Sequence, residues 1–138
     1  MTEHSVSTIR IAAALIDDEA GRLLLVRKAG TPWFMQAGGK IEGDETPLRA
    51  LQRELFQEIG LALQDDAAHY IGQFHAPAAN EPDHVLQAEI FHVRIRCPFT
   101  IGAEIAEAIW VESSEADLLP LAPLTRAHIL PMACKMRR

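Results

Sequence analysis

The stretch GKIEGDETPLRALQRELFQEIGL, residues 39–61, decides how the middle of this chain folds. Thr46 is a favourable N-cap, and Pro47 suits the first helical position, where its missing N–H costs nothing. Gly60 stands where a glycine commonly ends a helix. The stretch therefore predicts a helix over residues 47–59. Its aliphatic residues recur at spacings of three and four and form one apolar stripe that needs a sheet face to cover: Leu48, Leu51, Leu55 and Ile59.

The same helix carries two acids on another face. Glu54 and Glu58 are four residues apart, so they project from one side of the helix. Their like charges destabilise a bare helix by about 0.2–0.5 kcal/mol, and a hard divalent cation would turn that repulsion into attraction. A solvated acidic helix face is the alternative interpretation, and it describes most such pairs. The pair alone does not distinguish a metal site from a solvated face, so the surrounding residues must be considered.

Those surrounding residues follow a fixed pattern. Gly39 is followed after five residues by Glu45, and after seven more by the segment RELFQEIGL. This arrangement resembles the Nudix box, G-x5-E-x7-R-E-U-x-E-E-x-G-U, in which U is a bulky aliphatic residue. Gln57 departs from it by replacing the first Glu of the E-E pair, and Ala37 replaces a proline that commonly precedes the glycine pair. The chain is therefore similar to the Nudix hydrolases, enzymes that cut phosphoanhydride bonds in nucleoside diphosphate derivatives.

The resemblance implies a metal site on the helix. It assigns Mg²⁺ or Mn²⁺ to Glu54 and Glu58, with the carbonyl of Gly38 as a further oxygen ligand. Gln57 removes one negative charge from the usual cluster, although its amide oxygen can still bind the metal. A metal that bridges phosphate oxygens offsets developing charge and lowers the pKa of a bound water. Hydrolysis of a diphosphate is the reaction that this chemistry fits.

The resemblance also assigns supporting roles within the box. Arg53 and Glu45 match an ion pair that holds the loop against the helix, and Arg53 is counted with the catalytic set for that reason. Gly39 and Gly60 match turns in which a side chain would obstruct the backbone.

An acid outside the helix is expected to take a proton from the attacking water. Glu104 is the first choice, because family enzymes often place an extra catalytic Glu in this region, shortly before Trp110 here. Glu107 is the second candidate. An exposed loop acid without a catalytic role is an equal alternative for either residue.

Basic and aromatic residues near the box are candidates for binding substrate. Arg27 and Lys28 end a predicted strand, and strand alternation sends them to opposite faces, so that one of them points into the site. The resemblance favours Arg27 as the phosphate contact, and Lys40 follows the glycine pair. Phe34 is the candidate for stacking on a base, with core packing as its competing role.

The rest of the chain predicts strands interleaved with a few helices. A terminal helix is expected from about residue 124, and Pro131 should end or kink it. The expected fold class is α/β: a Nudix-type α/β/α sandwich with a mixed sheet, helix 47–59 on one side and the C-terminal helix on the other. The predicted strands cover residues 9–16, 22–28, 69–75, 84–96 and 109–112, and a short helix covers residues 113–119.

The composition bounds the class of protein. A chain of 138 residues has room for one domain, residues 1–138, with one core. Its net charge of −6 argues against a nucleic-acid polymer or a membrane surface as partner. The resemblance implies a small nucleotide-type substrate, whose phosphates this acidic chain can bind if its acids hold cations. Cys97 and Cys134 lie far apart without a CxxC motif, which predicts a reduced, cytoplasmic chain. A homodimer is compatible with the sequence, but no feature indicates one.

Three functions remain open at this point. The first is an active hydrolase of a nucleoside triphosphate or a nucleotide sugar. The second is a catalytically weak Nudix-fold module that binds or senses a nucleotide, because Gln57 weakens the metal cluster. The third, a structural domain, does not account for the box.

Overall fold

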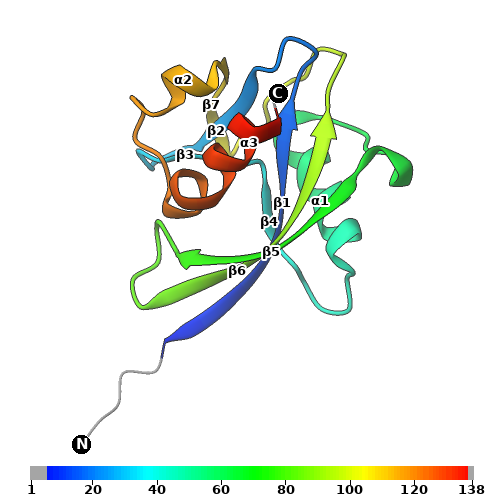
Figure 1. The fold of residues 1–138 in the computed structure, drawn as a ribbon. Coiled ribbons are helices and arrows are strands. Elements are labelled where there is room, and N and C mark those ends of the chain that lie inside the picture. The colour runs from blue at the N-terminus through cyan, green and yellow to red at the C-terminus, as the bar shows by residue number, and fades with distance from the viewer. Residues whose placement is uncertain (1–5, 137–138) are drawn as a thin grey trace, which may run out of the picture.

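The computed structural model describes residues 6–136, and the long strand β1 (Ser7–Asp17) lies at the centre of the sheet (Figure 1). Strand β6 (His84–Arg94) pairs with β1 in parallel along its whole length. Strand β4 (Gly38–Lys40) pairs with β1 antiparallel, with Gly39 opposite Ala12. The remaining strands extend the sheet to seven: β2 (Leu23–Lys28) beside β1, β3 (Phe34–Met35) and β7 (Ile105–Val111) beside β2, and β5 (His69–Pro77) beside β6.

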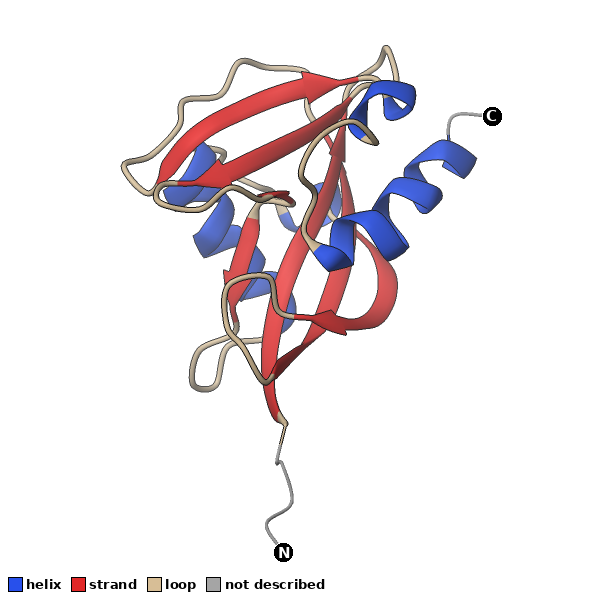
Figure 2. Cartoon of the chain, turned by 90° about the vertical axis from the view of Figure 1, so that its left-hand side faces the viewer, coloured by secondary structure: helices blue, strands red, loops and turns tan. Residues whose placement is uncertain are grey.

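The two faces of the sheet are covered by different helices. Successive residues of β1 alternate between them, so Ala12 and Ala14 pack towards α1 (Pro47–Ile59) while Ala13 and Leu15 pack towards the C-terminal helices. Figures 1 and 2 show α1 and α3 (Leu130–Met136) on opposite sides of the strands. The predicted α/β/α sandwich with a mixed sheet is confirmed.

Helix α1 has the bounds and caps that the sequence predicts. The Thr46 hydroxyl accepts a hydrogen bond from the Arg49 backbone N–H at 3.2 Å. Gly60 ends the helix in the left-handed region at φ 66°, where a side chain would be strained. Leu51 and Leu55 are fully buried in the core between α1 and the sheet. The apolar stripe therefore fixes which side of α1 faces the sheet, and so where its acids lie.

The predicted strands exist, with changed ends. Strand β7 begins at Ile105, four residues earlier than predicted, because antiparallel pairing with β2 orders a segment whose alternation Glu107 interrupts. Strands β3 and β4 fall between the predicted strand 22–28 and the predicted helix 47–59, where no strand was expected, since strands this short carry no readable periodicity. Helix α2 (Ser113–Ala116) is shorter than predicted, and a 3-10 turn, η1 (Asp65–Ala67), follows α1.

The C-terminal helix does not end at Pro131, which was one of the two effects predicted for this proline. A π-helical segment, η2 (Thr125–Ile129), leads directly into α3, and Pro131 is the second residue of α3 instead of its end. A proline ring clashes with the carbonyl four residues earlier in a regular α-helix. The wider π turns before Pro131 relieve that clash, so the helix changes type there and continues. Within residues 6–136, no helix has the length and apolar composition needed to cross a membrane.

Candidate active site

The two helix acids converge on the turn that contains the glycine pair. Glu58 is almost fully buried, and its Oε1 accepts a hydrogen bond from the Gly38 backbone N–H at 3.0 Å. The Glu54 carboxylate lies against Gly39, in the space that a Cβ on Gly39 would occupy. A Cβ at residue 39 would therefore force the Glu54 carboxylate away from the turn. Both carboxylates reach the same short segment from one face of α1, which is the convergence expected of a shared cation site.

Burial gives Glu58 an unusual ionisation. Removal from water raises the pKa of the Glu58 carboxyl to about 7, against the opposing effects of Lys28 and the Gly38 N–H. The negative charges of Glu54 and Glu104 raise the pKa of Glu58 further. Lys28 Nζ lies 3.9 Å from Glu58 Oε2 and is the nearest cation. The site concentrates negative charge that a divalent cation would stabilise.

The donor set fits magnesium or manganese better than a metal held by side chains alone. Within residues 6–136, no group of three or more His, Cys, Asp or Glu side chains is placed to hold a metal ion. Magnesium in proteins is commonly bound by one or two carboxylates, with waters and substrate phosphates completing its six ligands. Glu54, Glu58 and a carbonyl of the glycine turn match that sparse arrangement. Gln57 is exposed on α1, so its side chain is free to move towards or away from these acids.

An ion pair fixes the loop that carries the glycines. Arg53 binds Glu45 through two hydrogen bonds of 2.8 Å, from Nε and Nη2, and Nη2 also donates to the Lys40 carbonyl at 2.9 Å. The hydrogen bond from Arg53 holds the pKa of Glu45 at about 2. Arg53 Nη1 lies 3.5 Å from Glu54 Oε1. The predicted Arg53–Glu45 pair is confirmed, and it ties the segment after β4 to the helix that bears the acids.

Lys28, and not Arg27, faces the acids. Strand alternation sends Arg27 to the other side of β2, where its Nε binds Glu107 Oε1 at 2.9 Å and its Nη1 donates to the Thr31 carbonyl. A bulge at the end of β2 separates the pairing of Arg27 from that of Lys28. The structure therefore does not bring Arg27 to the acids, contrary to the expectation, and the basic residue of this strand end that lines the cavity beside the glycine pair is Lys28.

The two candidate acids near β7, Glu104 and Glu107, lie in different surroundings. Glu104 acts electrostatically on the Glu58 carboxyl, and its backbone carbonyl accepts a hydrogen bond from the Ala29 N–H at 2.9 Å. Glu107 is engaged by Arg27 on the other face. The geometry thus favours Glu104 as the acid outside the helix.

Phe34 does not face the site. Its side chain is only 7% exposed and belongs to the core between the sheet and the C-terminal helices, where its backbone N–H donates to the Pro120 carbonyl. The role of stacking on a base is therefore wrong for Phe34. Core packing was the competing interpretation, and it is the one that the structure shows, because burial of the large apolar ring is favourable.

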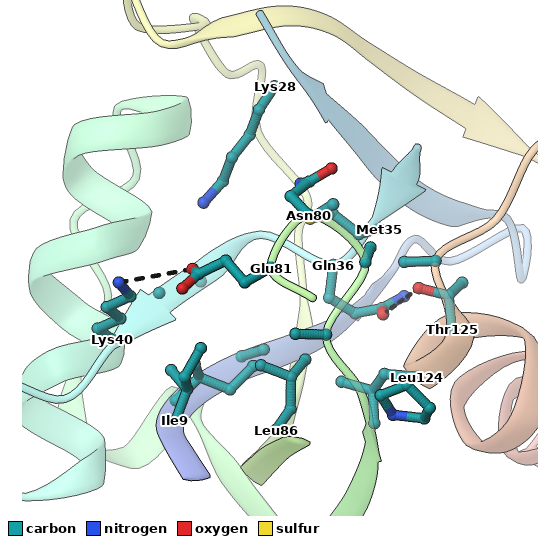
Figure 3. Close-up of a pocket in the computed structure, with 18 residues that line it drawn as sticks. Ile9, Lys28, Met35, Gln36, Lys40, Asn80, Glu81, Leu86, Leu124 and Thr125 are labelled. Carbon is teal, nitrogen blue, oxygen red and sulfur yellow. Dashed lines mark hydrogen bonds and ion pairs between the residues drawn. The ribbon is translucent and has the colours of Figure 1, made fainter. Parts of the chain in front are cut away.

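A cavity of about 140 Å³, open to solvent on one side, adjoins the glycine pair (Figure 3). Lys28 and Lys40 lie on its polar side, and Lys40 Nζ is 3.6 Å from Glu81. Apolar side chains of β1 and β6, including Ile9 and Leu86, form its floor. The sequence did not reveal Gln36, Asn80 or Thr125 as lining residues, because they come from three distant segments that only the fold brings together: the loop before β4, the loop after β5 and the start of η2.

A pH dependence of stability follows from the burial of Glu58. Between about pH 4.5 and pH 7 the folded metal-free chain keeps the Glu58 proton while the unfolded chain releases it. Raising the pH through this window should therefore lower the midpoint of thermal unfolding measured in a chelator. Glu45 has the opposite effect only at lower pH, because its pKa is depressed.

The matched variant for this measurement is Glu58→Gln, whose amide oxygen can still accept from the Gly38 N–H but does not titrate. The slope of the unfolding midpoint between about pH 5 and pH 7 should flatten in this variant. An equal slope in both proteins would show that Glu58 is ionised in the folded chain.

Comparisons with known proteins agree on one family. A model of the NUDIX domain matches residues 7–132. The chain is 30% identical to the 8-oxo-dGTP diphosphatase of Haemophilus influenzae over 113 aligned residues, and the alignment covers 79% of each chain. It is also 30% identical over 120 residues to the CTP pyrophosphohydrolase of Escherichia coli, which covers 83% of this chain and 84% of that one.

A solved structure supports the architecture. The MutT protein from Methanosarcina mazei Go1 matches with a TM-score of 0.77 and 20% identity, over 96% of both chains. At this identity the likeness concerns the fold alone.

Proposed function

Because this chain belongs to the Nudix hydrolase family, we propose that it cuts a phosphoanhydride bond in a nucleoside diphosphate derivative, either a nucleoside triphosphate or a nucleotide sugar, with magnesium or manganese as cofactor. One observation carries the proposal. The Glu54 and Glu58 carboxylates meet the Gly38–Gly39 turn, and a cavity with two lysines in its lining, Lys28 and Lys40, opens beside that turn.

Different residues around the glycine turn are proposed to bind the cation and the phosphates. Glu54, Glu58 and the carbonyl of Gly38 would hold the cation, with Gln57 able to add an amide oxygen. When bound, the cation supplies charge that offsets the negative phosphate oxygens and favours ionisation of water. Lys28 and Lys40 orient the phosphates, because their ammonium groups lie on the polar side of the cavity.

Proton transfer is assigned to an acid outside the helix. Glu104, whose charge is felt at Glu58, accepts a proton from the water that attacks phosphorus. The bridging oxygen of the anhydride leaves with the departing phosphate, and Lys28 stabilises the charge that develops there. Arg53 takes no part in the bond changes. It keeps the loop and Glu54 in position through its bonds to Glu45 and the Lys40 carbonyl.

A panel of nucleotides tests the proposal. Release of phosphate or pyrophosphate is measured for the common nucleoside triphosphates and several nucleotide sugars, with magnesium and with a chelator in its place. Turnover that requires the cation supports the proposed hydrolase. Binding of a nucleotide without turnover on the whole panel would instead support a sensor module, which the departure at Gln57 keeps as the second candidate.

Gln57 should set the magnesium requirement. Replacing Gln57→Glu adds one negative charge beside the pair of acids, and hard divalent cations are held largely by such charge. We expect the magnesium concentration for half-maximal rate to fall by about tenfold. A magnesium titration of both proteins on one accepted substrate measures it. Gln64→Glu, which adds the same charge at an exposed position beyond α1, is the control and should not move the midpoint.

The kcat of the Gln57→Glu variant has to be measured separately from its magnesium midpoint. Tighter metal binding can slow product release, so kcat of the Gln57→Glu variant could fall while its magnesium midpoint falls too. An unchanged or higher midpoint would mean that Gln57 does not lie in the electrostatic reach of the metal site.

A further inference from the structure

The segment that leads into β7 is seated on the C-terminal end of α1. The Thr100 N–H donates to the Ile59 carbonyl at 3.1 Å, and the Gly102 N–H donates to the Glu58 carbonyl at 2.8 Å. The last carbonyls of a helix have no partner within the helix, so these bonds satisfy groups that would otherwise need water. This segment, residues 99–105, is named the strap, and its position on the helix that bears the acids is fixed by these bonds.

Gly102 is a point of close contact between the strap and α1. A Cβ at residue 102 would overlap the backbone carbonyl oxygen of Gln57, and it would also contact the carbonyl oxygen of Glu58. Both oxygens belong to the helix backbone, which cannot move aside as the end of a flexible side chain can. A residue with a Cβ must therefore lift the strap from the helix by about 1 Å.

The other end of the strap is tied to β2. The Glu104 carbonyl accepts a hydrogen bond from the Ala29 N–H at 2.9 Å. Ala29 directly follows Lys28, whose Nζ lies 3.9 Å from the Glu58 carboxylate. The backbone of Glu104 is thus held between the helix and the strand that supply the other charged groups of the site.

A tight turn makes Gly102 and Glu104 move together. Only Ala103 separates them, and the Ile105 N–H closes the turn by donating to the Gly102 carbonyl at 3.1 Å. Ile105 is itself buried in the core beneath α1. Resting on the function proposed above, we propose that Gly102 is a positioning residue for Glu104: its lack of a side chain sets how near Glu104 lies to the acids of α1.

Replacing Gly102→Ala should lower kcat by at least about tenfold, because a displacement of about 1 Å misaligns the proton acceptor with the attacking water. KM should stay within about threefold, since Glu104 acts on the water and does not hold the substrate. Gly21→Ala is the control. Gly21 has a φ of 80° in the turn before β2, so its replacement strains the backbone at the end of β2 away from Lys28 and should leave kcat within about twofold.

A double replacement separates positioning from a general loss of structure. In a Glu104→Gln background the proton acceptor is already absent, so Gly102→Ala should lower kcat by no more than about threefold. An equal loss in both backgrounds would show that Gly102 does not act through Glu104, and it would overturn the proposal.

A second variant loosens the other end of the strap without a clash at α1. Gly30 has a φ of 81°, and the Thr31 N–H donates to the Lys28 carbonyl at 3.1 Å, as in a type II turn. Ala29 occupies the position of that turn where proline is common. Ala29→Pro should therefore fold, while it removes the N–H that holds the Glu104 carbonyl. A lower kcat at nearly constant KM is expected here as well.

Amide hydrogen exchange tests the seat of the strap even if no nucleotide on the panel is hydrolysed. The Ala29 amide is protected by the Glu104 carbonyl, so its exchange should quicken by at least about tenfold in Gly102→Ala. The amide of Leu55, on the buried face of α1, should keep its protection. This result supports the role of Gly102, and an absence of turnover would then count against the proposed hydrolase alone.

The outcome at Leu55 also identifies a chain that has lost its fold. If the Leu55 amide loses its protection in Gly102→Ala, the kinetics of Ala29→Pro decide the question. Unchanged exchange at Ala29 in a folded Gly102→Ala chain, or an unchanged kcat in both folded variants, would overturn the proposal.

Discussion

Replacing Glu58→Gln lowers kcat by at least about a hundredfold, the scale expected when a catalytic group is lost. The amide keeps the size of the carboxylate and can still accept from the Gly38 N–H, so the turn should stay in place. It removes the one buried charge of the site, and a neutral amide contributes little to holding a hard divalent cation. The loss should persist at high magnesium, because the geometry of the cation as well as its affinity depends on Glu58. Pyrophosphate or phosphate release on one accepted substrate measures the effect.

Two comparisons make this result specific. Glu115→Gln removes the charge of an exposed glutamate on α2 and should leave kcat within about twofold. The metal-free Glu58→Gln chain should also unfold at the same or a higher temperature near neutral pH, because burial disfavours the charged carboxylate. A folded Glu58→Gln enzyme with near-full activity would show that the acids of α1 do not drive the reaction.

The helix that bears the acids could be predicted in full because all of its signals are local. Thr46, Pro47 and Gly60 mark its ends, and the apolar stripe on α1 fixes the side that faces the sheet. Where local and tertiary preferences compete, prediction was less complete. Strand β7 is ordered by pairing with β2, and α3 continues through Pro131 because the preceding turns are of the π type. The sequence of β7 does not reveal its pairing with β2, and the sequence of α3 does not reveal the π turns that precede it.

The cavity shows a different limit of the sequence. Phe34 has an aromatic ring that could stack on a base, yet its backbone pairs with Leu121 in an isolated parallel bridge, and its side chain lies in the core. Gln36 and Thr125 are 89 residues apart and share no motif. Their hydrogen bond depends on the chain folding η2 back over the sheet, so no spacing in the sequence could indicate it.

The choice between Arg27 and Lys28 is the point at which the structure changes the expected chemistry, and the pair offers the sharpest comparison of two basic residues. Lys28 Nζ lies 3.9 Å from the Glu58 carboxylate and lines the cavity, whereas Arg27 is held by Glu107 and the Thr31 carbonyl. Replacing Lys28→Met should lower kcat/KM by about a hundredfold, because it removes a charge that stabilises the phosphates as they react. Arg27→Met should change kcat/KM by no more than about threefold, since an exposed ion pair contributes little.

The pH profile supplies a readout that a loss of packing would not change. Lys28 lowers the pKa of Glu58, which burial has raised to about 7, so removing Lys28 should move the pKa of Glu58 higher still. The carboxylate is the form that holds a cation, and the acid limb of kcat/KM should therefore shift to higher pH in Lys28→Met and stay in place in Arg27→Met. Both profiles are measured at one fixed, subsaturating magnesium concentration, where the ionisation of Glu58 still limits the rate. If Arg27→Met loses as much activity as Lys28→Met, or shifts the acid limb equally, then the phosphates bind on the other face of β2 and the site described here is placed wrongly.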